Sequence, residues 1–191
     1  MIGTTLQFVA KTLDGYIKNR LRLMPSDEKV LFTPLVDLDG SVAIREEQVL
    51  ALSLISMQPD PVASGSLRPQ VPAPEYAGDG PPPLHLNLYV ILSAYFPAKE
   101  VQAGLDVLSM AISYLQARPM WNAQNAPGFP SGVQKLVFEV ESQDIHQQSH
   151  LWGSVGAKYL PSMLYKIRTI IIDEGLDQVV GSIKEVDVRV S

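Results

Sequence analysis

Two histidines, His146 and His150, are candidates for metal chemistry because they lie four residues apart in the sequence. On a helix this spacing places two imidazoles on one face, as in metal-binding helices. The segment reads HQQSH, so it lacks the glutamate that serves as general base in helical zinc hydrolases. The helical period predicts that Ile145 and Trp152 face the core and that both histidines lie on the surface. A metallohydrolase that uses these histidines together with His85 is therefore disfavoured.

Three further patterns resemble ligand-binding motifs without completing one. Asp37 and Asp39 in DLDGS look like the start of a calcium loop, but the glycine comes too early and no bidentate glutamate follows, so the segment is a turn. Gly153 and Gly156 form an isolated GxxG without the context of a phosphate-binding loop. The chain has no cysteine, which excludes disulfides, thiolate catalysis and cysteine-bound metals. We predict no enzymatic activity, no catalytic or metal-binding residues and no cofactor.

Residues 151–168, LWGSVGAKYLPSMLYKIR, are rich in the residue types that form protein contacts. The stretch holds a tryptophan, two tyrosines and three basic residues, but no histidine or carboxylate. Trp, Tyr and Arg carry much of the binding energy in protein interfaces. Lys166 and Arg168 share an otherwise apolar strand face, where they either extend past the sheet rim or contact another subunit. We predict that this stretch packs against its own sheet and against other copies of the chain.

The composition favours a protein whose surface is partly covered by partners. Charged residues make up 18% of the chain, against a usual value of about 25%. A lightly charged monomer is the alternative. The net charge of −5 argues against nucleic acid as the main ligand.

The N-terminal sequence MIGTTLQFVAKTLDG does not resemble a signal peptide, because it has no basic region and charged residues interrupt its apolar run. No apolar run approaches the length of a membrane-spanning helix, so we expect no direct membrane insertion. We therefore expect synthesis and assembly in the cytoplasm.

Apolar periodicity predicts two main helices, over residues 2–21 and 97–118. A shorter helix should begin near Asp144, whose side chain can form a capping box with Gln147. In the second main helix one continuous apolar stripe is expected to face the core: Val101, Leu105, Leu108, Ile112 and Leu115.

Strands are predicted at residues 30–36, 48–57, 84–96, 133–141 and 162–172. Pro34 inside the first of them indicates an edge strand or a bulge. The strand at 84–96 alternates most clearly, with its even-numbered apolar residues towards the core and a polar and aromatic opposite face. These elements predict an α+β fold, a mixed and mostly antiparallel sheet with two main helices on one face.

Two segments do not fit this pattern. Residues 59–83 hold eight of the 15 prolines, so we expect an extended excursion rather than a helix or an interior strand. The tail at 176–191 alternates valines with charged residues, which predicts a strand arm that joins a neighbouring chain or folds onto its own sheet. We therefore expect one domain over residues 1–175 and a C-terminal extension.

The segment LWGSVGAKYLPSMLYKIRTIIIDEG, residues 151–175, closely resembles the signature of the N-terminal domain of cap proteins from phage-tail-like extracellular contractile injection systems. Similar segments are the opening helix, LVDLDGSVAIREE, PPLHLNLYVILSAYF and QNAPGFPSGVQKLVFEVES. The resemblance implies a fold similar to phage tail terminators and a homo-hexameric ring that closes the inner tube and sheath at the end distal to the baseplate. It also implies that tube and sheath proteins are partners of the chain. The particle would be either released or membrane-anchored. The resemblance supplies no catalytic residues.

We therefore expect a structural cap. The alternative is an assembly adaptor or chaperone for tube or sheath that is not retained in the particle. The expected interface residues are Tyr89, Tyr95, Trp152, Tyr159, Lys166, Arg168, Val186 and Val188.

Overall fold

The computed structural model describes residues 1–60 and 84–171. The predicted excursion at 59–83, apart from its first two residues, and the predicted tail at 176–191 lie outside these ranges. Three α-helices and one 3-10 turn are present: α1 (Ile2–Leu21), η1 (Ala98–Glu100), α2 (Val101–Ala117) and α3 (Ile145–Val155). The strands are β1 (Val30–Phe32), β2 (Val49–Pro59), β3 (Leu84–Tyr95), β4 (Met120–Trp121), β5 (Val133–Val140) and β6 (Ser162–Ile171). None of these helices is long and apolar enough to span a bilayer.

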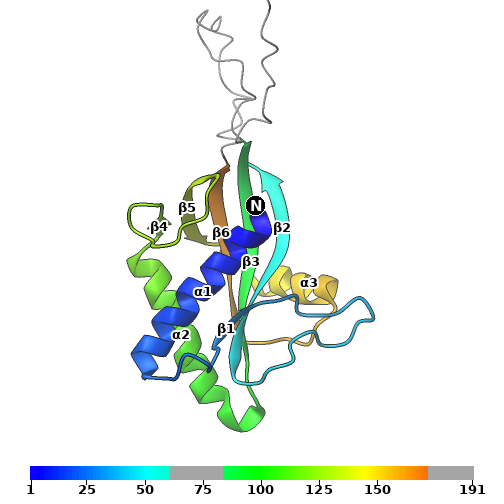
Figure 1. Ribbon diagram of the computed structural model, residues 1–191. Helices are drawn as coiled ribbons and strands as arrows, with labels where there is room; N and C mark the ends of the chain where they lie inside the picture. Colours follow the sequence, from blue (N-terminus) through cyan, green and yellow to red (C-terminus); the bar gives the residue numbers. More distant parts are fainter. Residues whose placement is uncertain (61–83, 172–191) are drawn as a thin grey trace, which may run out of the picture.

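The six strands form one sheet in the order β1-β2-β3-β6-β5-β4 (Figure 1). Only β1 and β2 pair in parallel, and the other neighbours are antiparallel. The expected mixed, mostly antiparallel sheet is thus confirmed. β1 is an edge strand, as Pro34 suggested, but it ends at Phe32, so this proline follows the strand rather than lying inside it.

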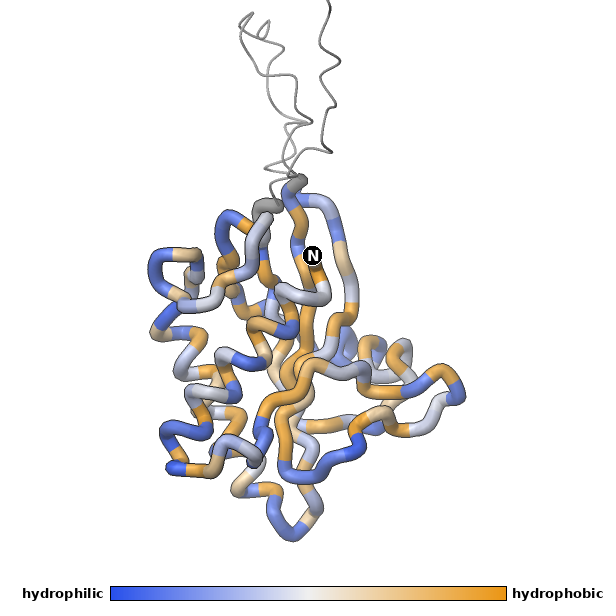
Figure 2. Tube along the Cα trace, viewed as in Figure 1, coloured by the Kyte–Doolittle hydropathy of each residue, from blue (hydrophilic) through white to orange (hydrophobic). Residues whose placement is uncertain are grey.

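The main core lies between the sheet and the pair α1 and α2, which cover one of its faces (Figure 1). The helix α1 contributes Leu6, Val9, Leu13 and Ile17, and all four are buried. From Leu86 to Ala94, the even-numbered residues of β3 pack against this layer, as the alternation predicted. Figure 2 shows the consequence, with hydrophobic residues concentrated along the central strands and hydrophilic residues at the outer turns.

The helix α2 lies in a different rotation from the predicted one. Val101 and Leu105 belong to the expected core stripe, yet they are 43% and 44% exposed. The buried face contains small residues as well as large ones: Gly104, Val107, Leu108, Ala111 and Leu115. The physical reason is the close approach of the Phe96 ring, because a Cβ placed on Gly104 would lie 2.8 Å from Phe96 Cγ. Gly104, the smallest residue in this turn of α2, therefore faces the sheet.

We expect Gly104→Ala to lower the free energy of unfolding, although alanine is favoured over glycine in helices by about 1 kcal/mol. The added methyl would force the Phe96 ring out of its place, which costs about 1–3 kcal/mol. Gly15→Ala in α1 is the matched control, because its new methyl meets nothing within 4 Å and should stabilise the fold. Urea unfolding followed by circular dichroism measures both changes, and equal stabilisation of the two variants would contradict the close contact.

The opposite face of the sheet is covered in part by α3, which begins with the predicted capping box. The Gln147 N–H donates to Asp144 Oδ1 at 2.7 Å, and the Asp144 N–H donates to Gln147 Oε1 at 3.0 Å. Trp152 packs into a second apolar cluster against the sheet, as predicted. The prediction for Ile145 is wrong, since its side chain is 82% exposed. The helix contacts the sheet through its C-terminal half, around Trp152, so its first turn extends beyond the sheet.

Candidate interaction surface

Beyond α3, the same sheet face becomes polar. The antiparallel register places Tyr89 of β3 beside Lys166 of β6, and Lys166 beside Glu139 of β5. Arg168 follows two residues along β6, so its side chain emerges on the same face. Asp60 directly follows β2 and its N–H donates to the His85 carbonyl at 2.9 Å. We call these five residues (Asp60, Tyr89, Glu139, Lys166 and Arg168) the charged sheet face.

The charges on this face pair with one another. Arg168 donates from Nε and Nη2 to Asp60 Oδ2, at 3.1 and 3.0 Å, and its Nη1 donates to Glu139 Oε1 at 3.4 Å. The Lys166 ammonium lies 2.7 Å from Glu139 Oε2. The Asp60 side chain is only 7% exposed, whereas that of Arg168 is 42% exposed. Asp60 and Glu139 therefore hold the side chains of Lys166 and Arg168 in place on this face.

The ion pairs favour the charged form of each partner. The hydrogen bond from Lys166, more than the attraction of its charge and that of Arg168, holds the pKa of Glu139 below its usual value. The hydrogen bond to Glu139 raises the pKa of Lys166, and the one to Asp60 raises the pKa of Arg168. Both basic residues thus remain charged at neutral pH with partners in their own chain. Their contact with another subunit stays a prediction.

We expect Asp60→Asn to lower the free energy of unfolding by about 1–3 kcal/mol, because it removes a nearly buried partner of Arg168. The amide keeps the shape of the side chain, so the loss reports on charge rather than packing. Chemical denaturation at neutral pH measures it, with Asp106→Asn on the exposed side of α2 as control. Equal stability of the two variants would show that the Arg168 pair contributes nothing.

We expect the effect of Glu139→Gln to depend on pH. The folded-state pKa of Glu139 is depressed, so its contribution is present above the unfolded pKa and is lost as the pH falls through the folded value. Because the Glu139 side chain is about one-third exposed, solvent screening limits the effect to less than about 1 kcal/mol at neutral pH. Unfolding curves of variant and parent should converge as the pH falls below about 4. A difference that persists in acid would rule out charge as its cause.

A hollow of about 490 Å3 lies at the other end of this sheet face, between the loop at 35–44 and the segment at 156–160. Tyr95 and Tyr159 both line it. The Tyr159 ring is 61% exposed and meets the Trp152 ring edge-on at a centroid distance of 5.7 Å. Trp152 itself is 5% exposed, so the exposed Tyr159 ring packs on a buried ring.

The structure thus gathers most of the predicted interface residues on one sheet face, in two groups. Tyr95 and Tyr159 line the hollow and Trp152 packs against Tyr159, while Tyr89, Lys166 and Arg168 belong to the charged sheet face. Val186 and Val188 lie outside the described residues. The use of any of these residues in contacts between chains stays a prediction.

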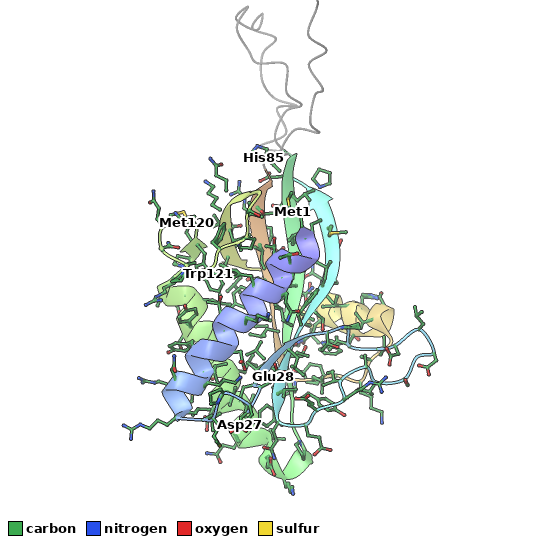
Figure 3. The ribbon with its side chains drawn as sticks, in the orientation of Figure 1. Met1, Asp27, Glu28, His85, Met120 and Trp121 are labelled. Carbon is green, nitrogen blue, oxygen red and sulfur yellow. The ribbon has the colours of Figure 1, made fainter. Side chains whose placement is uncertain are left out.

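The histidines do not form a site in the described parts of the chain. His146 and His150 are exposed on α3, as predicted, and His85 lies at the start of β3 (Figure 3). Residues 1–60 and 84–171 contain no group of three side chains that could hold a metal ion.

The segment DLDGS forms a turn, as predicted. The Asp37 N–H donates to the Ser41 carbonyl at 2.8 Å, and the Ser41 N–H donates to Asp39 Oδ1 at 2.9 Å. Gly40 adopts a positive φ of 81°, which favours glycine. Sequence reasoning missed the side chain at the tip of this turn, because Leu38 is fully exposed. The available signal was a large apolar residue between two aspartates, where a turn normally carries polar residues.

Sequence reasoning also missed a second hollow, of about 590 Å3, beside β4. Trp121, which is buried, and Met120, which is half exposed, line it at the end of α2 (Figure 3). Its other walls come from α1 and from the segment at 125–127. Sequence periodicity does not show a hollow that α1 and the distant stretch at 114–127 enclose.

Together these features define an α+β domain that carries a surface of aromatic, apolar and charged residues. The chain belongs to the Pvc16 N-terminal domain family, whose model matches residues 6–183.

Solved structures of two other proteins resemble the chain. The anti-feeding prophage cap, described as the AFP tube terminating cap, aligns with a TM-score of 0.52 and 16% identity, covering 94% of this chain and 58% of that one. The PVC sheath/tube terminator of an extracellular contractile injection system, in its extended state, aligns with a TM-score of 0.49 and 15% identity, covering 96% of this chain and 64% of that one. The chain thus spans less than two thirds of either protein. No curated protein sequence matches it.

Proposed function

We propose that this chain is a structural cap that terminates the tube of a contractile injection particle. The observation that carries the proposal is the family match over residues 6–183, together with a fold shared with the AFP tube terminating cap. The candidate site agrees with this role, because its charged residues pair with one another and its aromatic residues make packing contacts.

The finer features of the proposal are a homo-hexameric ring, made in the cytoplasm, and contacts with inner-tube and sheath proteins at the end distal to the baseplate. A closed ring suits this role because a heterologous contact between identical copies must close or it grows into a filament. The low proportion of charged residues supports extensive coverage by neighbours. The protein acts by occupying the tube end, and no chemical step is required.

Deletion of the gene tests the proposal. Without a terminator, tubes should vary widely in length, and sheaths should be absent or detached, as measured by electron microscopy of purified particles. Re-expression of the parent chain should restore a single length. Particles of normal length and full contractility in the deletion strain would contradict the proposal.

The alternative, an assembly adaptor or chaperone, predicts the same deletion phenotype but a different location. An epitope-tagged chain should be found at one end of mature particles if it is a cap. Its absence from mature particles would favour the chaperone. Mass photometry of the purified ring should give six copies, and a stable count of five or seven would contradict the hexamer.

A further inference from the structure

The turn at Asp37–Gly40, which we call the DLDG knob, projects from the loop between β1 and β2 (Figure 1). The buried residues Leu35 and Ile44 fix the two ends of this loop in the apolar cluster beneath α3. An antiparallel bridge between Val36 and Val42 and the hydrogen bonds of the turn hold the knob itself. A preorganised loop loses little conformational entropy on binding. The knob therefore has a fixed backbone, which presents the fully exposed Leu38 side chain to solvent.

The hollow beside β4, which we call the β4 hollow, has the chemistry to receive such a side chain. Its main lining residues are Phe8, Thr12, Tyr114, Arg118, Met120 and Trp121. The Phe8 and Tyr114 rings meet Trp121 edge-on, at centroid distances of 6.1 and 5.9 Å, and form an aromatic wall. A concave, mostly apolar site with few polar groups is the usual form of a pocket that accepts an apolar anchor.

The charges beside the two features are complementary. Arg118 is the one charged residue that lines the β4 hollow. Its guanidinium lies 5.2 Å from the centre of the Tyr114 ring and donates to Tyr114 Oη at 3.3 Å, and it forms no ion pair with any described residue. In the knob, Asp39 accepts from Ser41 and has no ion pair with a described residue, while Asp37 lies 3.7 Å from the exposed Arg45. Two carboxylates thus flank the apolar anchor, and one cation borders the hollow.

The knob and the hollow lie at opposite edges of the sheet. The knob belongs to the loop between β1 and β2, at one end of the strand order, and the hollow adjoins β4, at the other end (Figure 1). Two different patches on opposite sides of one molecule are what a head-to-tail contact between identical copies requires. An isologous pair would instead need one patch that complements itself.

We propose that the DLDG knob of one copy docks into the β4 hollow of the next copy, with Leu38 against the aromatic wall and the knob carboxylates facing Arg118. The inference rests on the proposed ring of identical caps and assigns its contact. It gives each copy one donor side and one acceptor side, so the contact propagates from copy to copy until the ring closes.

Cysteine cross-linking tests this contact directly, since the chain contains no cysteine of its own. Ser41→Cys lies directly after the knob and Ala117→Cys marks the wall of the hollow, and both positions are exposed. In the full chain that carries both changes, a short bismaleimide should produce a ladder of covalent multimers, both in the purified protein and in whole particles. Each single variant should remain monomeric on denaturing gels.

Two controls make the result specific. Ser41→Cys combined with Gln102→Cys, an exposed position at the opposite end of α2, should give no ladder. Leu38→Asp, added to the chain that carries Ser41→Cys and Ala117→Cys, should reduce the cross-linked fraction at least about tenfold. This is the loss of affinity expected when one leucine side chain is no longer buried. Because Leu38 is fully exposed, this change leaves the fold intact.

Absence of a ladder in both the purified chain and whole particles would overturn the contact. Cross-links to a tube or sheath protein instead of a second copy would also overturn it, as would dimers formed by Ser41→Cys alone. These outcomes are separable from failure of the proposed function. If the deletion strain makes irregular tubes but the double-cysteine chain gives no ladder, the cap role stands and the contact is wrong. If the double-cysteine chain gives a ladder but the deletion strain makes normal tubes, the contact stands and the cap role is wrong.

Discussion

Trp121→Ala should lower the free energy of unfolding by about 3–5 kcal/mol, the usual cost of removing a large buried ring. Trp121 is buried at the meeting point of α1, α2 and β5. Its ring packs against Phe8, Tyr114 and Phe138, with centroid distances between 4.5 and 6.1 Å. Alanine would leave the contacts of these three rings with the indole unmade. Urea unfolding followed by circular dichroism measures the change.

Trp121→Phe separates packing from hydrogen bonding at the same position. The indole Nε1 donates to the Arg118 carbonyl at 2.9 Å, which fixes the chain where α2 gives way to β4. Phenylalanine keeps most of the apolar contact but loses this bond, so we expect a smaller loss, of about 1–2 kcal/mol. An alanine variant that is no less stable than the phenylalanine variant would contradict the packing role.

Trp152→Ala should also lower the free energy of unfolding by about 3–5 kcal/mol. The loss of structure should be greatest in α3. Trp152 is the one residue of α3 that is fully buried, and the rest of the helix contacts the sheet only partly. Removing its ring leaves α3 with little to attach it to the sheet. We expect hydrogen exchange to accelerate strongly in α3 and only slightly in α1, because weakly packed elements open locally.

Two variants serve as controls for Trp152. His150→Ala lies on the exposed side of the same helix and should leave both stability and exchange nearly unchanged. The Trp152 Nε1 has no hydrogen-bond partner among the described residues, so Trp152→Phe loses no bond to them and should cost less than Trp121→Phe. Uniform acceleration of exchange across the whole chain in Trp152→Ala would contradict the local role.

Strand positions and helix spans could be predicted because burial imposes a period on each element. The even-numbered residues of β3 face the large helices, and this alternation was visible in the sequence. The capping box of α3 was equally predictable, since Asp144 and Gln147 satisfy a local rule. Predictions of this kind depend on residues within one or two turns of each other.

The rotation of α2, the exposure of Ile145 and the ion pairs of Arg168 depend on distant parts of the chain. Phe96 packs against Gly104, so the buried side of α2 is shifted from the predicted stripe, although Leu108 and Leu115 are buried as predicted. Asp60 and Arg168 are 108 positions apart, so their pairing follows from the strand order and not from any local pattern. The resemblance to cap proteins identified the family, but it did not place Leu38 or the β4 hollow.

The position of β6 in the strand order has a consequence for biosynthesis. This strand is the last in the described sequence, yet it lies in the middle of the sheet, between β3 and β5. Until it emerges from the ribosome, β1, β2 and β3 have no hydrogen-bonded connection to β4 and β5, and the inner edge of β3 is unpaired. Pairings between residues far apart in the chain form late, and unpaired edges expose nascent chains to association. The sheet therefore becomes complete only once translation has passed Ile171.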